Sequence, residues 1–181
     1  MKRLLMLGAA LLALAACEES PMGPVDVHTA SGLTEQSLPP PTAFDPRAFA
    51  WSTAPGPDIL VGVLRYRRYG LPYGCAGEDV LLIPDVPWSR RRMIILYGAA
   101  SSAAVPVSIV RARTPSAPSG DYARFVRRTT CDADGRFTFQ DLPDGGWFVV
   151  TVAKPPDPAG DSVAITRRVE LHGGTRSITL S

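Results

Sequence analysis

Asp132-Ala133-Asp134-Gly135 and Leu142-Pro143-Asp144-Gly145 are the two stretches that decide the fold of this chain. Both have the composition of tight turns, in which Asp side chains cap backbone N–H groups and Gly supplies a positive φ. Arg136–Phe139 lies between them and is predicted to be a strand. The run after the second turn, Trp147–Lys154, is apolar at successive positions, which is typical of a central strand buried on both faces.

The same pattern of short strands and turns extends in both directions from this centre. Most of the segment 85–120 reads as an insertion, and it contains a possible helix at Trp88–Tyr97 because Gly98 follows as a stop. Loops are expected at Tyr69–Gly77 and Pro155–Asp161. The glycines of His172-Gly173-Gly174-Thr175 predict a hairpin between the last two strands. Seven closely spaced strands with little helix predict an all-β, antiparallel sandwich; the remaining expected strands are Ile59–Tyr66, Val80–Ile83, Tyr122–Thr130, Val163–Leu171 and Arg176–Leu180, with one more possible at Val105–Arg111.

Residues 59–181 resemble the carboxypeptidase regulatory-like domain. The resemblance rests on Thr129–Phe139, on Leu142–Gly145 and on Trp147, and it is supported by Ala76–Val80 and by the end of the chain at 174–180. It implies a seven-strand transthyretin-like (prealbumin-like) sandwich that serves as an accessory or binding module without catalysis. The chain departs from the family pattern in having Cys131 where a Thr is usual, and in carrying the insertion between the second and third strands.

The N-terminus has the pattern of a bacterial lipoprotein signal. Lys2 and Arg3 precede an apolar run, Leu4–Ala13, that is too short to span a bilayer as a mature helix. Leu14-Ala15-Ala16-Cys17 resembles a lipobox, so we expect a signal peptide over 1–16 and acylation, for example with palmitate, on Cys17. An ordinary signal peptide with a chance cysteine is the alternative. Glu18 leaves the outer membrane, facing the periplasm, as the expected destination.

A linker is predicted for residues 17–57 because the segment 18–57 holds eight prolines and no sustained periodicity. The domain is therefore expected at 58–181. Removal of 1–16 would leave 17 basic and 17 acidic side chains, and this balance argues against a nucleic-acid partner.

Catalytic and cofactor motifs are missing from the sequence. The chain has two histidines, His28 and His172, and neither a phosphate-binding glycine loop nor a nucleophile elbow. Asp132 and Asp134 do not fit a calcium loop, because Gly135 comes fourth where an EF-hand needs its Gly sixth. We therefore expect no enzyme activity, no metal and no cofactor; a hydrolase or metal protein with a hidden site is the least favoured reading.

Ligand contacts are proposed at aromatic and basic residues of the insertion. Trp88 and Tyr97 could stack on sugars, and Arg90, Arg91 and Arg92 could bind the phosphates or carboxylates of an envelope polymer. The alternative is that the aromatic residues form a second small core and that the arginines form a solvated helix start. The expected function is a membrane-anchored binding or scaffolding module with an envelope protein or polysaccharide as its target. A carbohydrate-binding module is the alternative.

Cys75 and Cys131 remain once Cys17 is acylated, in a compartment where disulfides persist. If Val80–Ile83 and Tyr122–Thr130 pair antiparallel, as the resembled family implies, the two cysteines lie at one end of the sandwich, close enough for a disulfide. Two free thiols are the alternative. A redox or metal-binding pair is disfavoured because the chain has no Cys-x-x-Cys spacing.

Overall fold

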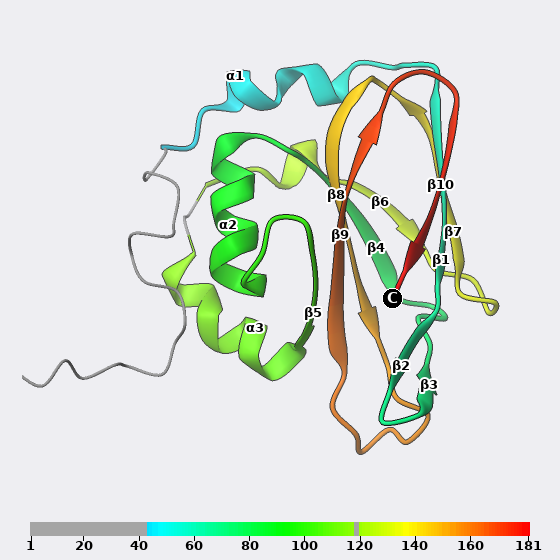
Figure 1. The fold of residues 1–181 in the computed structure, drawn as a ribbon. Helices are drawn as coiled ribbons and strands as arrows, with labels where there is room; N and C mark the ends of the chain where they lie inside the picture. The colour runs from blue at the N-terminus through cyan, green and yellow to red at the C-terminus, as the bar shows by residue number, and fades with distance from the viewer. Residues whose placement is uncertain (1–42, 118–119) are drawn as a thin grey trace, which may run out of the picture. The chain divides into compact units, whose positions relative to one another are not determined.

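The computed structural model describes residues 43–117 and 120–181. The predicted signal peptide, Cys17 and the first part of the predicted linker lie outside these residues. The described residues all belong to one compact unit, Leu33–Ser181. Figure 1 shows two sheets packed face to face, with helices on the outer side of one of them.

The smaller sheet has three strands in the order β10-β1-β7. Its central strand is β1 (Asp58–Leu64), which pairs antiparallel with β7 (Arg136–Leu142) and parallel with β10 (Thr175–Leu180). Burial alternates strictly along β1, as expected for a strand with one face on a core and the other toward water.

The larger sheet has five strands in the order β5-β9-β8-β4-β6, and all of its pairings are antiparallel. Its centre is β8, whose residues Trp147 to Thr151 are buried in succession. The prediction of a central strand is therefore confirmed. The strands are β4 (Asp79–Pro84), β5 (Ser102–Pro106), β6 (Arg127–Thr130), β8 (Gly145–Ala153) and β9 (Val163–Leu171).

The main core lies between the sheets and contains Leu60, Trp147 and Leu180. The outer face of β4 and β8 is covered separately: Met93 of α2 (Pro87–Tyr97) packs there against Ile83 and Phe148. This second layer explains why β8 is apolar on both faces, and it assigns the predicted insertion a packing role. The other insertion elements are α3 (Val107–Arg113) and the 3-10 helices η3 (Thr114–Ser116) and η4 (Ala123–Phe125).

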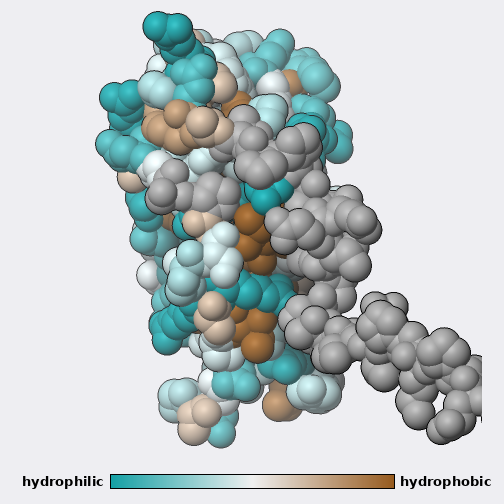
Figure 2. Space-filling view, turned by 90° about the vertical axis from the view of Figure 1, so that its left-hand side faces the viewer, coloured by the Kyte–Doolittle hydropathy of each residue, from teal (hydrophilic) through white to brown (hydrophobic). Residues whose placement is uncertain are grey.

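The predicted helix in the insertion is confirmed. The Ser89 hydroxyl accepts a hydrogen bond from the Val86 N–H at 2.9 Å and donates one to the Pro84 carbonyl at 2.5 Å, which fixes the start of α2. Gly98 ends the helix in the left-handed region at φ 80°. Figure 2 looks onto this helical side and shows patches of hydrophobic surface among hydrophilic residues.

The prediction of an all-β sandwich is confirmed, but three of its details are wrong. Among the described residues the two sheets hold three and five strands, eight rather than seven. The sheets are not wholly antiparallel, because β10 lies beside β1 in parallel. The turn at His172–Gly174 is therefore not a hairpin: it carries the chain from β9 in one sheet to β10 in the other. Gly173 and Gly174 both have positive φ, and this freedom serves a crossing turn as well as a hairpin.

The boundary of the predicted linker is also wrong. Residues 46–53 form α1 (Pro46–Phe49) and η2 (Ala50–Thr53), and Asp45 caps α1 through a 2.9 Å hydrogen bond from the Arg47 N–H. Phe49 is fully buried, stacked on Phe125 with ring centroids 5.1 Å apart. Arg127 donates to the carbonyls of Ser52 and Ala54. Residues 44–54 thus belong to the domain rather than to a tether.

Three other expected elements differ in extent. Tyr122–Thr130 is not one strand, because η4 occupies its first half and only β6 pairs. The candidate strand Val105–Arg111 is mostly helix, since β5 ends at Pro106 and α3 follows. The loop expected at Tyr69–Gly77 contains half of a two-stranded hairpin, formed by β2 (Tyr66–Arg68) and β3 (Leu71–Tyr73).

Candidate functional site: an acidic pocket at the turn end of the sandwich

Three segments far apart in the sequence meet at the end of the sandwich where β1 begins. The first residue of β1, Asp58, is paired with Leu142 at the end of β7. The β9–β10 turn closes over both, because the Gly173 N–H donates to Oδ1 of Asp144 at 3.0 Å. The Gly174 carbonyl accepts from the Ile59 N–H at 3.0 Å. The two turns that separate the strands therefore converge on Asp58.

A pocket of about 240 Å³ opens at this meeting point. Sites for drug-sized ligands usually have volumes of roughly 300–1,000 Å³, so this pocket suits one small chemical unit. It is lined by Asp58, Glu170, Leu171, His172, Gly173, Gly174, Thr175 and Arg176.

Asp58 is the unusual member of this lining. Its side chain is buried, with the residue 1% exposed, and Oδ2 has no hydrogen-bond partner. Burial raises the pKa of Asp58, and the neighbouring carboxyl of Asp144 raises it further, while the Gly173 N–H and His172 lower it. A carboxylate accepts hydrogen bonds but donates none, so the unpaired oxygen calls either for a proton shared with the neighbouring Asp144 carboxyl or for a donor supplied by a ligand.

A second buried carboxylate, Asp85, lies at the same end of the larger sheet, where its N–H donates to the Gly146 carbonyl. It accepts two hydrogen bonds from Arg90, at 2.9 and 2.8 Å, and one from Arg168 at 2.5 Å. Arg168 also pairs with Glu170 of the pocket. Asp85, Arg90, Arg168 and Glu170 form one ion-pair cluster, in which the side-chain hydrogen bonds of Asp85 go to the two arginines. This cluster supports the pocket wall, and Asp85 is not a free acceptor for a ligand.

The aromatic residues predicted to contact a ligand are occupied by packing. Trp88 is 2% exposed and lies in a cluster with Phe49, Val86 and Phe125, so stacking of its indole on a sugar is excluded in this arrangement. Tyr97 packs on the outer face of the larger sheet, where burial raises its pKa to about 12. The alternative reading, a second small core in the insertion, describes both residues.

The three consecutive arginines do not form one uniform basic face. Arg90 is held by Asp85, and Arg92 lies over the rings of Tyr122 and Trp88, at 5.2 and 5.9 Å from their centroids. Arg91 is half-buried on the same helix. At least two of the three predicted ligand contacts therefore have structural roles.

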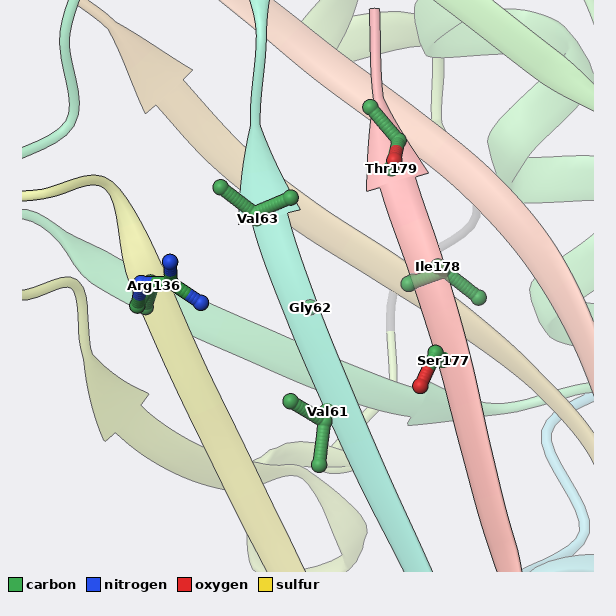
Figure 3. Close-up of a pocket in the computed structure, with 7 residues that line it drawn as sticks. All are labelled: Val61, Gly62, Val63, Arg136, Ser177, Ile178 and Thr179. Carbon is green, nitrogen blue, oxygen red and sulfur yellow. The ribbon is translucent and has the colours of Figure 1, made fainter.

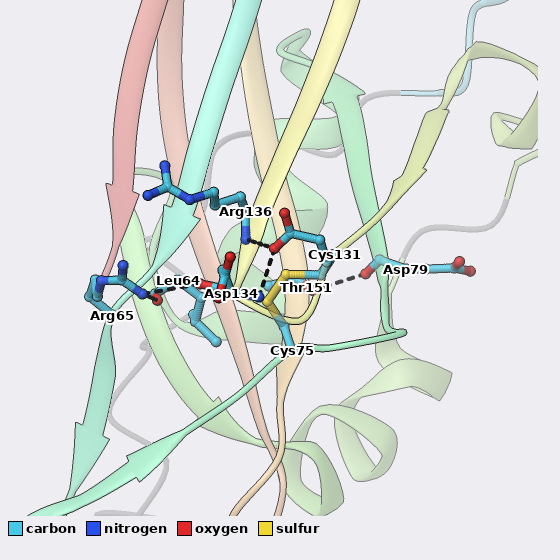
Figure 4. The surroundings of a disulfide bond; sticks show 9 residues. Leu64, Arg65, Cys75, Asp79, Cys131, Asp134, Arg136 and Thr151 are labelled. Carbon is cyan, nitrogen blue, oxygen red and sulfur yellow. Dashed lines mark hydrogen bonds between the residues drawn. A yellow bond between two sulfur atoms is a disulfide. The ribbon is translucent and has the colours of Figure 1, made fainter.

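Cys75 and Cys131 form a disulfide at the opposite end of the sandwich, with Cα atoms 5.7 Å apart (Figure 4). The premise of that prediction is also confirmed, since β4 and β6 pair antiparallel. The Asp132 turn lies beside the bridge. Oδ1 of Asp132 accepts from the N–H groups of Asp134 and Arg136, at 2.9 and 2.7 Å, and Gly135 has φ 78°. This carboxylate is thus a turn cap.

A shallow groove of about 250 Å³ crosses the outer face of the smaller sheet (Figure 3). Val61 and Val63 of β1 lie between Arg136 of β7 and the hydroxyl side chains of Ser177 and Thr179 on β10. No buried polar group points to a ligand there, because the orphaned side-chain atoms of the described residues belong to Asp58 and Trp88.

Within residues 43–117 and 120–181, no group of three His, Cys, Asp or Glu side chains could hold a metal ion. None of the helices in these ranges is long and apolar enough to cross a membrane.

The fold of this chain resembles that of a solved protein structure. No family model matches the chain, and no curated protein matches it. The crystal structure of a proposed carbohydrate binding protein from Pseudomonas aeruginosa is similar over 79% of this chain and 98% of its own, with a TM-score of 0.57 and 20% identity. At this identity the likeness supports the sandwich fold alone.

Proposed function

We propose that this chain is a non-enzymatic binding module of the bacterial envelope that takes a carbohydrate unit in the acidic pocket. In this proposal residues 1–16 direct export and Cys17 carries the lipid anchor, probed by a prediction in the Discussion. The domain is of the carboxypeptidase regulatory-like, transthyretin-like kind. The outer membrane, facing the periplasm, is the proposed location.

The observation that carries the proposal is the unpaired Oδ2 of buried Asp58 in a pocket of one-unit size. A buried acceptor without a partner costs free energy, and a hydroxyl donor from a ligand would remove that cost. Sugars present hydroxyl groups in pairs, and Asp58 and Glu170 supply two carboxyl groups in the pocket lining to receive them; the carboxyl of Asp144 lies next to Asp58, outside that lining. Arg176 and His172 add donors at the rim for the ring and glycosidic oxygens.

The similar structure from Pseudomonas bears the name of a carbohydrate binding protein, so sugars are the first ligand class to test. The mode of binding differs from stacking on loop aromatics, because Trp88 and Tyr97 are committed to packing. Recognition would instead use carboxylates held by turns.

The test is binding of the chain from residue 17 onward, with Cys17→Ser, to a glycan array and to peptidoglycan fragments, followed by titration calorimetry on the hits. Asp58→Asn should weaken binding by about ten- to a hundredfold, the value of hydrogen bonds to a charged group, and Asp144→Asn should weaken it less, because Asp144 lies beside Asp58 and outside the pocket lining. Asp134→Asn, at the disulfide end, is the matched control and should bind as the parent does. Equal affinity for all four proteins, or no sugar bound by any of them, would overturn the assignment.

A further inference from the structure

The hairpin formed by β2 and β3 carries two of the three large hydrophobic side chains that are exposed among the described residues. Tyr69 at its tip is 88% exposed and Leu71 is 54% exposed; the third, Ile109, lies on α3 and is 41% exposed. Three arginines, Arg65, Arg67 and Arg68, stand in the same short segment, and no acidic residue occurs from 65 to 77. The hairpin thus has an apolar tip and a basic flank.

The conformation of the tip is well defined. Tyr69 and Gly70 both have positive φ, at 51° and 79°, which is the geometry of the tight two-residue turn that suits a twisted hairpin. Arg67 donates to the Gly70 carbonyl at 2.5 Å, and the Arg68 guanidinium lies 5.1 Å from the centroid of the Tyr69 ring. A residue with a side chain as large as that of Tyr rarely takes a positive φ. The Tyr69 ring is nevertheless not packed in the core and is exposed to solvent.

The base of the hairpin is fixed to the body of the domain. Tyr66 and Tyr73 pack edge to face at 5.5 Å, partly buried against the main core. Gly74 and Lys154 exchange two backbone hydrogen bonds, of 2.9 and 2.7 Å. The next residue, Cys75, is in the disulfide. A rigid base therefore presents an exposed tip, and Figure 1 shows the hairpin at the end of the sandwich away from α1.

We propose that this hairpin, by its exposed Tyr69 and Leu71 and its three arginines, docks on the surface of a bilayer that contains anionic lipids. Tyr rings favour the membrane–water interface, and arginines beside them are attracted to anionic headgroups. The long aliphatic stems of these arginines allow the charges to stay among the headgroups while the tip enters. Charge and apolar surface thus point to the same partner.

The proposal rests on the proposed export and anchoring only for the presence of a nearby bilayer. The chain between Cys17 and the described domain, residues 18–42, can span at most roughly 80 Å when extended, so the domain could turn either end to the membrane. Docking through the hairpin would select one orientation. Because β1 begins at the acidic pocket and ends two residues before the hairpin, this orientation points the pocket away from the lipid.

The experiment is co-sedimentation of the Cys17→Ser chain with vesicles of phosphatidylcholine alone and of an equal mixture with phosphatidylglycerol. Binding should need phosphatidylglycerol and weaken as salt rises. Arg67→Gln/Arg68→Gln should lower the partition coefficient by about twenty-five-fold, at about fivefold for each arginine near an anionic surface. Tyr69→Asn/Leu71→Ser, in which Asn tolerates the turn conformation, should remove most of the remaining binding.

Matched controls carry the same changes on the helical side, at Ile109→Ser and at Arg111→Gln/Arg124→Gln, and should bind as the parent does. An unchanged melting temperature shows that each variant is folded. Equal loss in the controls, binding to neutral vesicles, or stronger binding to a soluble anionic polysaccharide than to vesicles would overturn the proposal. Sugar binding in the pocket is measured separately with Asp58→Asn, so failure of one proposal is distinguishable from failure of the other.

Discussion

The guanidinium of Arg168 on β9 donates to the buried carboxylate of Asp85 at 2.5 Å, although the two residues are 83 positions apart. Asp85 follows β4 directly and precedes α2, so this contact fastens the start of the insertion to the larger sheet. Gly146 packs closely against the same contact. A Cβ at this position would lie 3.0 Å from both Arg168 and Asp85, which leaves little room for a side chain.

Replacing Asp85 should therefore destabilise the domain clearly. Asp85→Asn leaves Arg90 and Arg168 without their carboxylate; both are partly exposed, so we expect a loss of about 2 kcal/mol, below the 3–5 kcal/mol of fully buried pairs. Urea unfolding measures it. Asp79→Asn, which removes an exposed partner of Arg128, is the control and should cost less than about 1 kcal/mol. Similar losses of unfolding free energy for the two variants would contradict a stabilising role for the Asp85 ion pairs.

The disulfide should contribute more to the free energy of unfolding than the ion pairs of Asp85 do. Cys75 and Cys131 close a loop between positions 56 apart, and the chain-entropy model assigns such a loop about 4 kcal/mol as an upper figure. Cys75→Ser and Cys131→Ser should each lower the melting temperature, and the double variant should be no less stable than either single one. Thiol titration of the unreduced chain with Cys17→Ser should find no reactive cysteine; two reactive thiols would refute the bridge.

The stability of the domain should depend on pH through Asp58. Its pKa is raised in the folded state, chiefly by burial, so the native form holds its proton at pH values where the unfolded chain has released it. This contribution is favourable at low pH and is lost as the pH rises through the folded pKa. Asp58→Asn should then melt higher than the parent at pH 7, on the order of 2–4 °C if about 1 kcal/mol is relieved.

The difference between Asp58→Asn and the parent should shrink as the pH falls from the folded pKa toward the ordinary Asp value of about 3.9, below which the parent carboxyl is mostly protonated in both states. Differential scanning calorimetry from pH 4 to pH 8 follows this gap. An Asn variant that melts lower than the parent at neutral pH would show that the Asp58 charge is stabilising.

The segment before β1 should behave as part of the domain. Phe49 is fully buried against Phe125 and Trp88, so Phe49→Ala should cost about 3–5 kcal/mol, as for other buried aromatic residues. Amides of residues 47–54 should exchange slowly with deuterium. Phe44→Ala is a graded comparison, since Phe44 is only partly buried on the same cluster. Fast exchange at 47–54 would restore the linker interpretation.

Anchoring makes the fifth prediction. If Cys17 is the acylated residue, radiolabelled palmitate should enter the parent chain, and Cys17→Ala should leave an uncut precursor or release the protein from the membrane fraction. Label retained by Cys17→Ala would refute the lipobox, whatever the fate of the domain.

Sequence reasoning succeeded where local chemistry decides the structure. The Asp132–Gly135 turn follows from its residue types, because an Asp cap and a positive φ at Gly are local requirements. The apolar run at Trp147–Lys154 predicted a strand buried on both faces, and β8 is covered by the main core on one face and by the α2 layer on the other. The cysteine pair needed one non-local assumption, the antiparallel pairing that the family resemblance implied, and β4 and β6 meet it.

It failed where distant packing decides the structure. Trp88 looked available because an insertion carries it, yet Phe49, from the segment predicted to be a linker, packs against it and helps to bury it. The acidic pocket was missed because Asp58, Asp144 and His172 stand in three separate segments. One local signal was present, since Asp58 is a charged residue at the start of an otherwise apolar strand. The sequence pattern is the same whether such a strand end is exposed to solvent or buried, so this signal did not identify the pocket.

The parallel pairing of β1 with β10 has a consequence for the order in which the domain can form. The first strand of the sandwich receives one of its two neighbours from the last, with Ile59 opposite Thr175 and Leu64 opposite Leu180. Until those final residues arrive, β1 has an open edge and the core lacks Ile178 and Leu180. If the chain is exported N-terminus first, as proposed, the sandwich would stay incomplete until these last residues have crossed the membrane. During that interval the chain would be exposed to proteases and chaperones.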